Sequence, residues 1–195
     1  MGSVIWHDIA GLLSQYNLEI FAETGTHTGA AVDHALEQGF RRAFSIESSP
    51  VLVKRAREHL EQRWPPQGPH RRFEVECMTS PEGIDWILSK LDAPALWWLD
   101  AHFPRLYGDL ETRTDLPLLA EIEMIVAAGR TKDVILTDDM QIWFDTSVPF
   151  MPEKGVFKGN QVDIVRARQA LAKTHVTYIS REGNGFLLPL PRCRT

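Results

Sequence analysis

Several features of other protein classes are missing from this sequence. No run of about 18 apolar residues occurs, so we expect no membrane-spanning helix. The 195 residues include only two cysteines, Cys77 and Cys193, which lie far apart without metal-ligand spacing. We therefore expect free thiols in a reducing compartment. The first residues lack a basic segment and a cleavage site, which argues against a secretion signal and favours a cytoplasmic protein.

An excess of basic residues is also missing. Lys and Arg number 21 against 26 Asp and Glu, and the net charge is −5. Because binding to nucleic-acid phosphates normally needs a basic face, nucleic acid is not the expected partner. One stretch is locally basic, and we interpret it as a solvated helix face and loop. Its basic residues are Arg41, Arg42, Lys54, Arg55, Arg57, Arg63, Arg71 and Arg72.

Short apolar segments alternate with helical segments along the chain. The expected strands are 21–24, 42–47, 72–77, 95–99, 134–137, 176–180 and 185–189. The expected helices are 29–38, 49–64, 81–91, 116–128 and 162–173. This alternation predicts an α/β protein with a parallel sheet covered on both faces. Because the last two strands are close enough for an antiparallel hairpin, we expect one Rossmann-like three-layer domain, residues 1–195, with a seven-stranded, mostly parallel sheet.

Four tryptophans are expected in the core of this domain. They are Trp6, Trp86, Trp97 and Trp98. Hydrophobic residues make up 44% of the chain and charged residues 24%, which is typical of a globular protein with a full core.

The first predicted strand runs into a glycine turn, E-T-G-T-H-T-G, which starts at Glu23. Gly25 and Gly29 place a tight turn ahead of a helix, whose free N–H groups and positive dipole end can face a ligand. Glu47 ends the next strand, where dinucleotide-binding folds use an acid to hold both ribose hydroxyls. A pyrophosphate-binding turn reads G-x-G-x-x-G, but His27 stands at the middle glycine. Its Cβ obstructs a pyrophosphate, and the negative charge of Glu23 favours a cation.

The turn, the acid after the second strand and the order of seven strands together resemble the class I S-adenosylmethionine-dependent methyltransferases. The resemblance implies S-adenosylmethionine as the cofactor, with Glu23 at its amino-acid end, Gly25 beneath it and Glu47 on its ribose hydroxyls. The other residues that we assign to the cofactor site are Thr24, Thr26, His27, Gly29, Ser48, Thr79 and Asp100.

One part of the chain departs from the pattern of that family. The family often has an acid-containing motif after the third strand, which meets the adenine. Here the sequence is Cys77-Met78-Thr79-Ser80. Thr79 or Ser80 can hydrogen-bond adenine and Met78 can pack on it, but Ser80 can instead cap the helix that follows.

Three aspartates follow the fourth and fifth strands. Asp100 ends the segment ALWWLD, and Asp138 and Asp139 end VILTDD. Carboxylates that converge repel one another, and a divalent cation with oxygen ligands relieves the repulsion. The arrangement resembles the metal-dependent O-methyltransferases, both the catechol type and the sugar-modifying type. That resemblance implies Mg²⁺ held by the three aspartates and a small hydroxylated acceptor bound to the metal, with Asp100 also a catalytic residue.

His102 lies two residues beyond Asp100 and is the expected general base, because an imidazole pKa near neutrality suits removal of a hydroxyl proton. Other roles stay open. The strand-end acids can pair with neighbours, Asp138 can start a loop, and His102 can be structural. Two long connections, 103–115 and 141–161, carry candidate acceptor contacts. These are Arg105, Tyr107, Trp143 and Phe144.

The predicted function is S-adenosylmethionine-dependent O-methylation of a small hydroxylated molecule. Three alternatives remain: a nicotinamide-dependent oxidoreductase, a methyltransferase-like binding module without turnover, and a nucleic-acid methyltransferase. The sequence specifies neither the acceptor nor the oligomeric state, and a homo-oligomer stays open.

Overall fold

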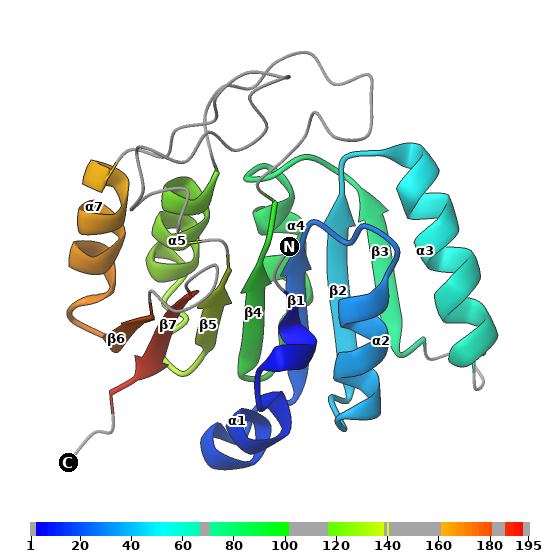
Figure 1. Ribbon diagram of the computed structural model, residues 1–195, viewed down its shortest axis with the longest axis horizontal. Coiled ribbons are helices and arrows are strands. Elements are labelled where there is room, and N and C mark those ends of the chain that lie inside the picture. The colour runs from blue at the N-terminus through cyan, green and yellow to red at the C-terminus, as the bar shows by residue number, and fades with distance from the viewer. Residues whose placement is uncertain are drawn as a thin grey trace.

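The computed structural model describes residues 3–66, 71–101, 117–138, 140, 161–180 and 186–192. Seven strands form one sheet in the order β3-β2-β1-β4-β5-β7-β6, with helices on both faces (Figure 1). The strands are β1 (Ile20–Thr24), β2 (Arg42–Glu47), β3 (Phe73–Cys77), β4 (Ala95–Leu99), β5 (Val134–Thr137), β6 (His175–Ser180) and β7 (Phe186–Pro191). The helices are η1 (Val4–Trp6), α1 (Ile9–Tyr16), α2 (Ala30–Glu37), α3 (Pro50–Arg63), α4 (Gly83–Lys90), α5 (Leu118–Ala127) and α7 (Gln161–Leu171).

The sheet confirms the expected fold class. Strands β1 to β5 pair in parallel, and β7 is antiparallel to both β5 and β6. Every predicted strand and helix is present, with ends within two residues of the prediction. No helix in the described ranges is long and apolar enough to cross a membrane.

The N-terminal helices η1 and α1 were not predicted. Asp8 caps α1 by accepting a hydrogen bond from the Gly11 N–H at 2.8 Å, and an apolar run follows it, so the signal was there. Trp6 is 71% exposed on η1, and the prediction that it belongs to the core is wrong.

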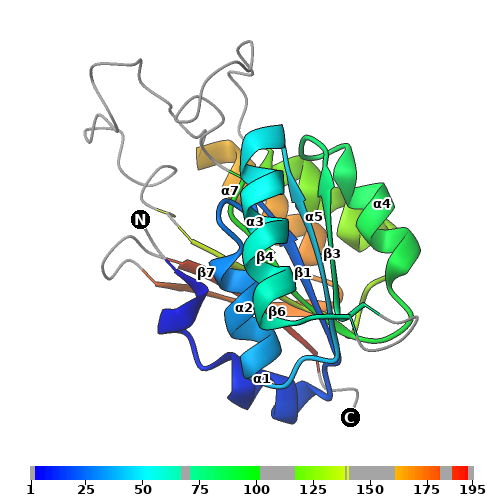
Figure 2. The same cartoon turned by 90° about the vertical axis from the view of Figure 1, so that its right-hand side faces the viewer.

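Two apolar clusters fill the spaces on either side of the sheet. Successive side chains of a strand point to opposite faces, so Trp97 packs in the cluster under α4, α5 and α7, and Trp98 in the cluster under α1, α2 and α3. Figure 2 shows the sheet between these two helix layers. Both tryptophans are buried as predicted, and Trp86 is half-buried against the first cluster.

A polar network closes the amino edge of the sheet. The buried Asp133 carboxylate accepts hydrogen bonds from the Ala95 N–H at 3.1 Å, the Trp97 indole at 2.8 Å and Arg130 Nε at 2.8 Å. His175 Nε2 lies 2.9 Å from the Asp133 carbonyl oxygen. This network joins β4, β5 and β6 at the edge opposite the glycine turn.

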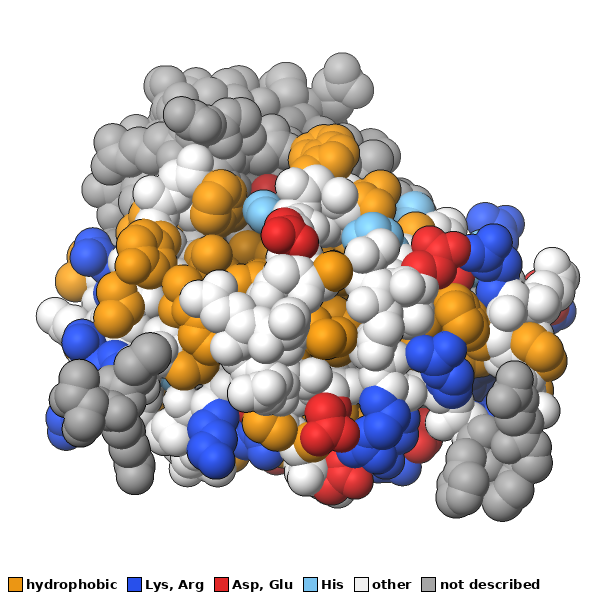
Figure 3. Space-filling view, turned by 90° about the horizontal axis from the view of Figure 1, so that it is seen from below, with side chains coloured by type: hydrophobic (Ala, Val, Ile, Leu, Met, Phe, Trp, Pro, Cys, Tyr) orange, Lys and Arg blue, Asp and Glu red, His pale blue; other side chains and the backbone are white. Residues whose placement is uncertain are grey.

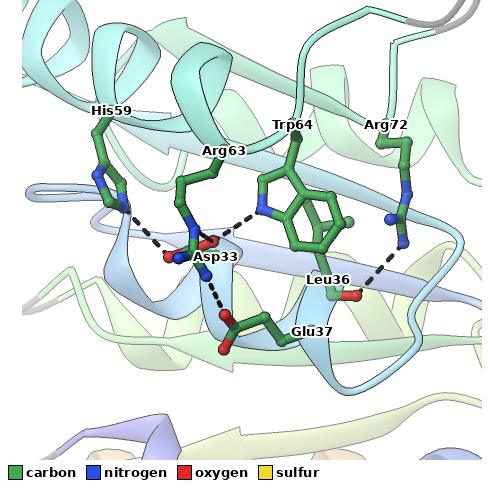
Figure 4. Close-up of polar contacts among 7 residues, drawn as sticks. All are labelled: Asp33, Leu36, Glu37, His59, Arg63, Trp64 and Arg72. Carbon is green, nitrogen blue, oxygen red and sulfur yellow. Dashed lines mark hydrogen bonds and ion pairs between the residues drawn. The ribbon is translucent and has the colours of Figure 1, made fainter.

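Helices α2 and α3 are joined by polar contacts around Asp33 (Figure 4). The Asp33 carboxylate accepts a hydrogen bond from the Trp64 indole at 2.8 Å and lies 3.3 Å from Arg63 Nε and from His59 Nε2. The Arg72 guanidinium stacks over Trp64 at 4.5 Å from the ring centre. These contacts hold α3 against α2. Because α2 starts at the glycine turn, they also help to fix the position of that turn.

Among its residues that the structure describes, 41–66 and 71–72, the locally basic stretch does not form a basic face. Most of its cations pair with acids: Arg41 with Glu19 and Asp92, Arg42 with Asp92, Lys54 with Glu58, Arg57 with Glu76, Arg63 with Glu37, and Arg71 with Glu61. Figure 3 shows basic and acidic side chains intermingled on the face that it presents. This agrees with the interpretation of a solvated helix face.

Candidate functional site

The glycine turn after β1 presses against the backbone at the end of β4. Gly25 has φ +90°, and a Cβ added there would lie 2.8 Å from the Asp100 carbonyl oxygen. Gly29 has φ +85° and forms the N-cap of α2. His27 also adopts a left-handed conformation, with φ 51°. A side chain at position 25 is thus excluded by both conformation and space.

The Glu47 carboxylate lies at this turn. Its Oε2 accepts a hydrogen bond from the His27 N–H at 2.9 Å, and its Oε1 accepts one from the Ser49 N–H at 2.9 Å. Ser48 Oγ lies 3.3 Å from Oε1. Since a carboxylate has about four acceptor sites, these contacts with described residues leave one for a ligand hydroxyl. Glu47 therefore joins the turn to the start of α3 and keeps some capacity for binding.

Glu23 lies beneath the turn rather than on it. It is 1% exposed, and Ser45 Oγ on the neighbouring strand donates a hydrogen bond to its Oε2 at 2.6 Å. The Thr26 hydroxyl is hydrogen-bonded to the same Ser45 hydroxyl. Burial raises the pKa of Glu23 to about 8, the charge of Glu47 adds to the rise, and the Ser45 hydrogen bond opposes it. Glu23 is thus mostly protonated near neutral pH, unlike the negative charge expected at the turn.

Two other residues assigned to the cofactor direct their side chains inward. Thr24 and Thr26 are 0% and 2% exposed. The N–H groups of Gly25 and Thr26 donate to the Ile46 carbonyl at 2.9 and 3.2 Å. Backbone hydrogen bonds, with the contact between the Thr26 and Ser45 hydroxyls, therefore hold the turn from within.

The aspartates after β4 and β5 start from neighbouring positions. Leu99 and Thr137 are register partners, and Asp100 and Asp138 follow them directly. The Asp100 N–H donates to the Thr24 carbonyl at 3.1 Å, and Asp138 is 5% exposed. In the part of the chain that the structure describes, no group of three or more His, Cys, Asp or Glu side chains is placed to hold a metal.

Several assigned residues lie outside the described residues. They are His102 and Asp139 from the catalytic and metal assignments, and Arg105, Tyr107, Trp143 and Phe144 from the two long connections. The metal site and the general base therefore stay predictions.

The loop after β3 uses its polar groups for internal contacts. The Met78 N–H donates to the Glu47 carbonyl at 3.0 Å, and Thr79 Oγ1 donates to Glu82 at 2.7 Å. Ser80 does not cap α4, which begins at Gly83, because its hydroxyl donates to Glu121 instead. Thr79 is exposed and keeps acceptor capacity for a base.

Sequence reasoning missed Glu121. It lies on α5 with no exposed surface, and burial raises the pKa of its carboxyl to about 7 while the Ser80 and Thr24 hydroxyls oppose the rise. Its position, three residues after Leu118 and four before Ile125, falls on the apolar face of the helix. A charged residue on that face was a signal in the sequence.

Comparisons with known proteins identify the fold. No protein-family model and no curated protein matches the chain. The methyltransferase PaMTH1 from Podospora anserina, solved with S-adenosylhomocysteine bound, has a TM-score of 0.58 and 15% identity over 99% of this chain and 80% of that chain. The O-methyltransferase TomG from Streptomyces achromogenes, involved in tomaymycin synthesis and solved with S-adenosylmethionine, has a TM-score of 0.57 and 16% identity over 95% and 78%.

A third protein of similar structure is named as a methylase of a ribosomal protein rather than of a small molecule. The ribosomal protein L11 methylase from Lactobacillus delbrueckii subsp. bulgaricus has a TM-score of 0.55 and 14% identity over 100% of this chain and 81% of that chain. At these identities the likeness concerns the fold alone. The chain has the Rossmann-like fold of the class I S-adenosylmethionine-dependent methyltransferases.

Proposed function

We propose that this chain is an S-adenosylmethionine-dependent methyltransferase that acts on a hydroxyl oxygen of a small molecule, with assistance from Mg²⁺. The observation that carries the proposal is the Glu47 carboxylate, held at the glycine turn by the His27 N–H at 2.9 Å. A carboxylate at such a turn suits a ribose diol.

The residues of the turn fit the cofactor. Because Gly25 has no Cβ, the turn packs directly against the Asp100 backbone, which fixes its position after β1. The remaining acceptor site of Glu47 suits a ribose hydroxyl. Glu23 lies under the turn, and a cationic ligand nearby lowers its pKa and favours its ionised form. Bound S-adenosylmethionine supplies the methyl group and leaves as S-adenosylhomocysteine.

The acceptor end of the proposal rests on Asp100, Asp138 and Asp139. Their carboxylates are the ligands that Mg²⁺ prefers, and the first two follow adjacent strands. Mg²⁺ held by these residues would supply positive charge that favours loss of the acceptor's hydroxyl proton. His102 takes the hydroxyl proton as general base. The protein's main contribution is to align the acceptor oxygen with the methyl group.

Two observations favour a small acceptor. TomG, a solved neighbour, is an O-methyltransferase involved in tomaymycin synthesis. The basic residues between 41 and 72 are largely paired with acids, which leaves little free positive charge there for nucleic-acid phosphates.

Calorimetric titration with S-adenosylhomocysteine tests the cofactor. We expect Glu47→Gln to weaken binding about tenfold to hundredfold, because a hydrogen bond to a charged acceptor is lost. Glu58→Gln, which changes an exposed acid of α3, is the matched control and keeps wild-type affinity. Failure of the wild-type protein to bind S-adenosylhomocysteine or S-adenosylmethionine contradicts the proposal, and heat from NADH instead revives the nicotinamide alternative.

Separate experiments test the metal and the acceptor. Mg²⁺ added to the protein with S-adenosylhomocysteine gives heat that vanishes with EDTA and in Asp138→Asn. Incubation of the protein with S-adenosylmethionine and a panel of catechols and polyols gives methylated products by mass spectrometry. Cofactor binding without any product across the panel would favour the binding-module alternative.

A further inference from the structure

Helix α5 carries a carboxyl group on its core-facing side. Leu118, Ile122 and Ile125 are buried there, and Glu121 on the same side has no exposed surface. A carboxyl group loses its hydration when it is buried, which opposes folding unless hydrogen bonds replace the water. Because an apolar residue would satisfy the packing, the acid at this position calls for a separate explanation.

The Glu121 carboxyl lies between two segments of the candidate site. Ser80, in the loop between β3 and α4, donates its hydroxyl to Glu121 Oε1. Thr24, the neighbour of Gly25, has its hydroxyl near enough to lower the Glu121 pKa, but without hydrogen-bond geometry. Within the described ranges, Glu121 Oε2 has no hydrogen-bond partner. The carboxyl thus separates the glycine turn from the β3–α4 loop.

The β3–α4 loop, residues 78–82, is also fixed on its other sides. The Met78 N–H bonds to the Glu47 carbonyl at 3.0 Å. A Cβ on Gly83 would lie 2.5 Å from Ile46 Cδ1 and 3.2 Å from Met78 Cβ, so α4 starts in close contact with the end of β2. The Ser80–Glu121 hydrogen bond adds a link to α5. A loop held from several directions can present Thr79 at a defined position.

We infer that Glu121 is a positioning residue, which sets the spacing between the glycine turn and the β3–α4 loop and thereby the affinity for the nucleoside of the cofactor. The inference rests on the proposed function and on the assignment of both the turn and Thr79 to the cofactor site. Glu121 has no exposed surface and acts through Ser80, whose hydroxyl donates to its carboxyl.

Three variants separate this role from a purely structural one. Glu121→Leu fills the space but accepts no hydrogen bond from Ser80. Glu121→Gln keeps an acceptor oxygen for Ser80, and Ser80→Ala removes the donor. The matched control is Glu123→Leu, the same change on the exposed side of α5. For each protein we measure the Kd of S-adenosylhomocysteine by calorimetry and the Tm by differential scanning calorimetry.

We expect Glu121→Leu and Ser80→Ala each to raise the Kd about tenfold, while Glu121→Gln and Glu123→Leu stay near the wild-type value. The double variant Glu121→Leu/Ser80→Ala binds no more weakly than Glu121→Leu, because both changes break one link. The Tm of Glu121→Leu equals or exceeds that of the wild type, since an apolar side chain avoids the cost of burying a carboxyl.

Two results overturn the inference alone: wild-type affinity in both Glu121→Leu and Ser80→Ala, or a loss of affinity that follows a loss of Tm in every variant. A wild-type protein that binds no S-adenosylhomocysteine overturns the proposed function as well, so the two failures are distinguishable.

Discussion

At the scale of single residues, Gly25 decides whether the turn can exist as it does. Its φ of +90° costs a side-chain-bearing residue about 1 kcal/mol or more, and the Asp100 carbonyl occupies the place of a Cβ. The first effect concerns stability and the second concerns the shape of the site. A control glycine with a similar φ but free space separates them.

We therefore expect Gly25→Ala to destabilise the protein by about 1–3 kcal/mol and to weaken S-adenosylhomocysteine binding about tenfold or more. Gly39, with φ +104° and no atom within 4 Å of an added Cβ, is the matched control. Gly39→Ala loses stability similarly but keeps its affinity. Urea unfolding and calorimetry measure the two quantities, and normal binding by Gly25→Ala would contradict the expected crowding.

Cys77 provides a chemical probe of the same edge. It is exposed and free at the end of β3, it is the register partner of Glu47, and its Sγ lies 3.8 Å from the Ser48 carbonyl oxygen. We expect saturating S-adenosylhomocysteine to slow alkylation of Cys77 by N-ethylmaleimide about several-fold, because a ligand bound beside β3 would reduce the access of the reagent to the thiol. Peptide mapping by mass spectrometry follows Cys77 separately from Cys193. An unchanged rate would place the nucleoside away from β3.

At the scale of elements, Asp133 holds the amino edge of the sheet together. Its carboxylate is 1% exposed and serves a backbone N–H, the Trp97 indole and Arg130. Removing it leaves the indole N–H buried without its partner. The cost falls on β4 and β5, at the opposite end from the glycine turn.

We expect Asp133→Ala to lower the free energy of unfolding by about 3–5 kcal/mol with little change in S-adenosylhomocysteine affinity. Asp92→Ala is the control, because Asp92 pairs with Arg41 and Arg42 at the surface, and we expect less than about 1 kcal/mol. Urea denaturation measures both. A fall for Asp133→Ala no larger than for Asp92→Ala would show that the network contributes little.

The elements themselves were readable from local patterns. Alternating apolar segments and glycine turns predicted every strand of the sheet, because these signals act over a few residues. The pattern did not say which strand of the C-terminal hairpin pairs with β5. That choice depends on packing between distant segments, and β7 makes the contact. The helix α1 was missed although Asp8 and the apolar run after it are a helix start.

The candidate site was predictable in position but not in chemical state. Because the carboxyl ends of parallel strands meet at one edge of the sheet, Glu47 was predicted to lie near the glycine turn. There it accepts a hydrogen bond from the His27 N–H. The protonation of Glu23 depends on its burial beside Ser45, which the sequence does not reveal. Glu121 carried a signal, an acid on an apolar helix face, but its partner Ser80 is 41 residues away.

At the scale of the whole molecule, buried acids shape the dependence of stability on pH. The pKa of Glu23 is about 8 in the folded protein against a reference of 4.5, so the folded state binds more protons than the unfolded state between these values. Stability therefore falls as the pH rises through this window. Glu121 acts with the same sign, up to its pKa of about 7. His7 and His175, whose pKa values burial lowers, act with the opposite sign below 6.5.

Above the reference pKa of the histidines, 6.5, the contribution of Glu23 is separable from theirs. We expect the Tm of the wild-type protein to fall as the pH is raised from about 6.5 to about 8.5, because ionising the buried Glu23 costs free energy only in the folded state. Glu23→Gln keeps the size of the side chain and does not ionise, so its Tm falls less over the same range. Glu19→Gln, an exposed acid just before β1, is the control and follows the wild type. Parallel Tm profiles for the wild type and Glu23→Gln would mean that Glu23 is already ionised at pH 6.5. Glu23 would then carry the negative charge that the sequence analysis expected at the glycine turn.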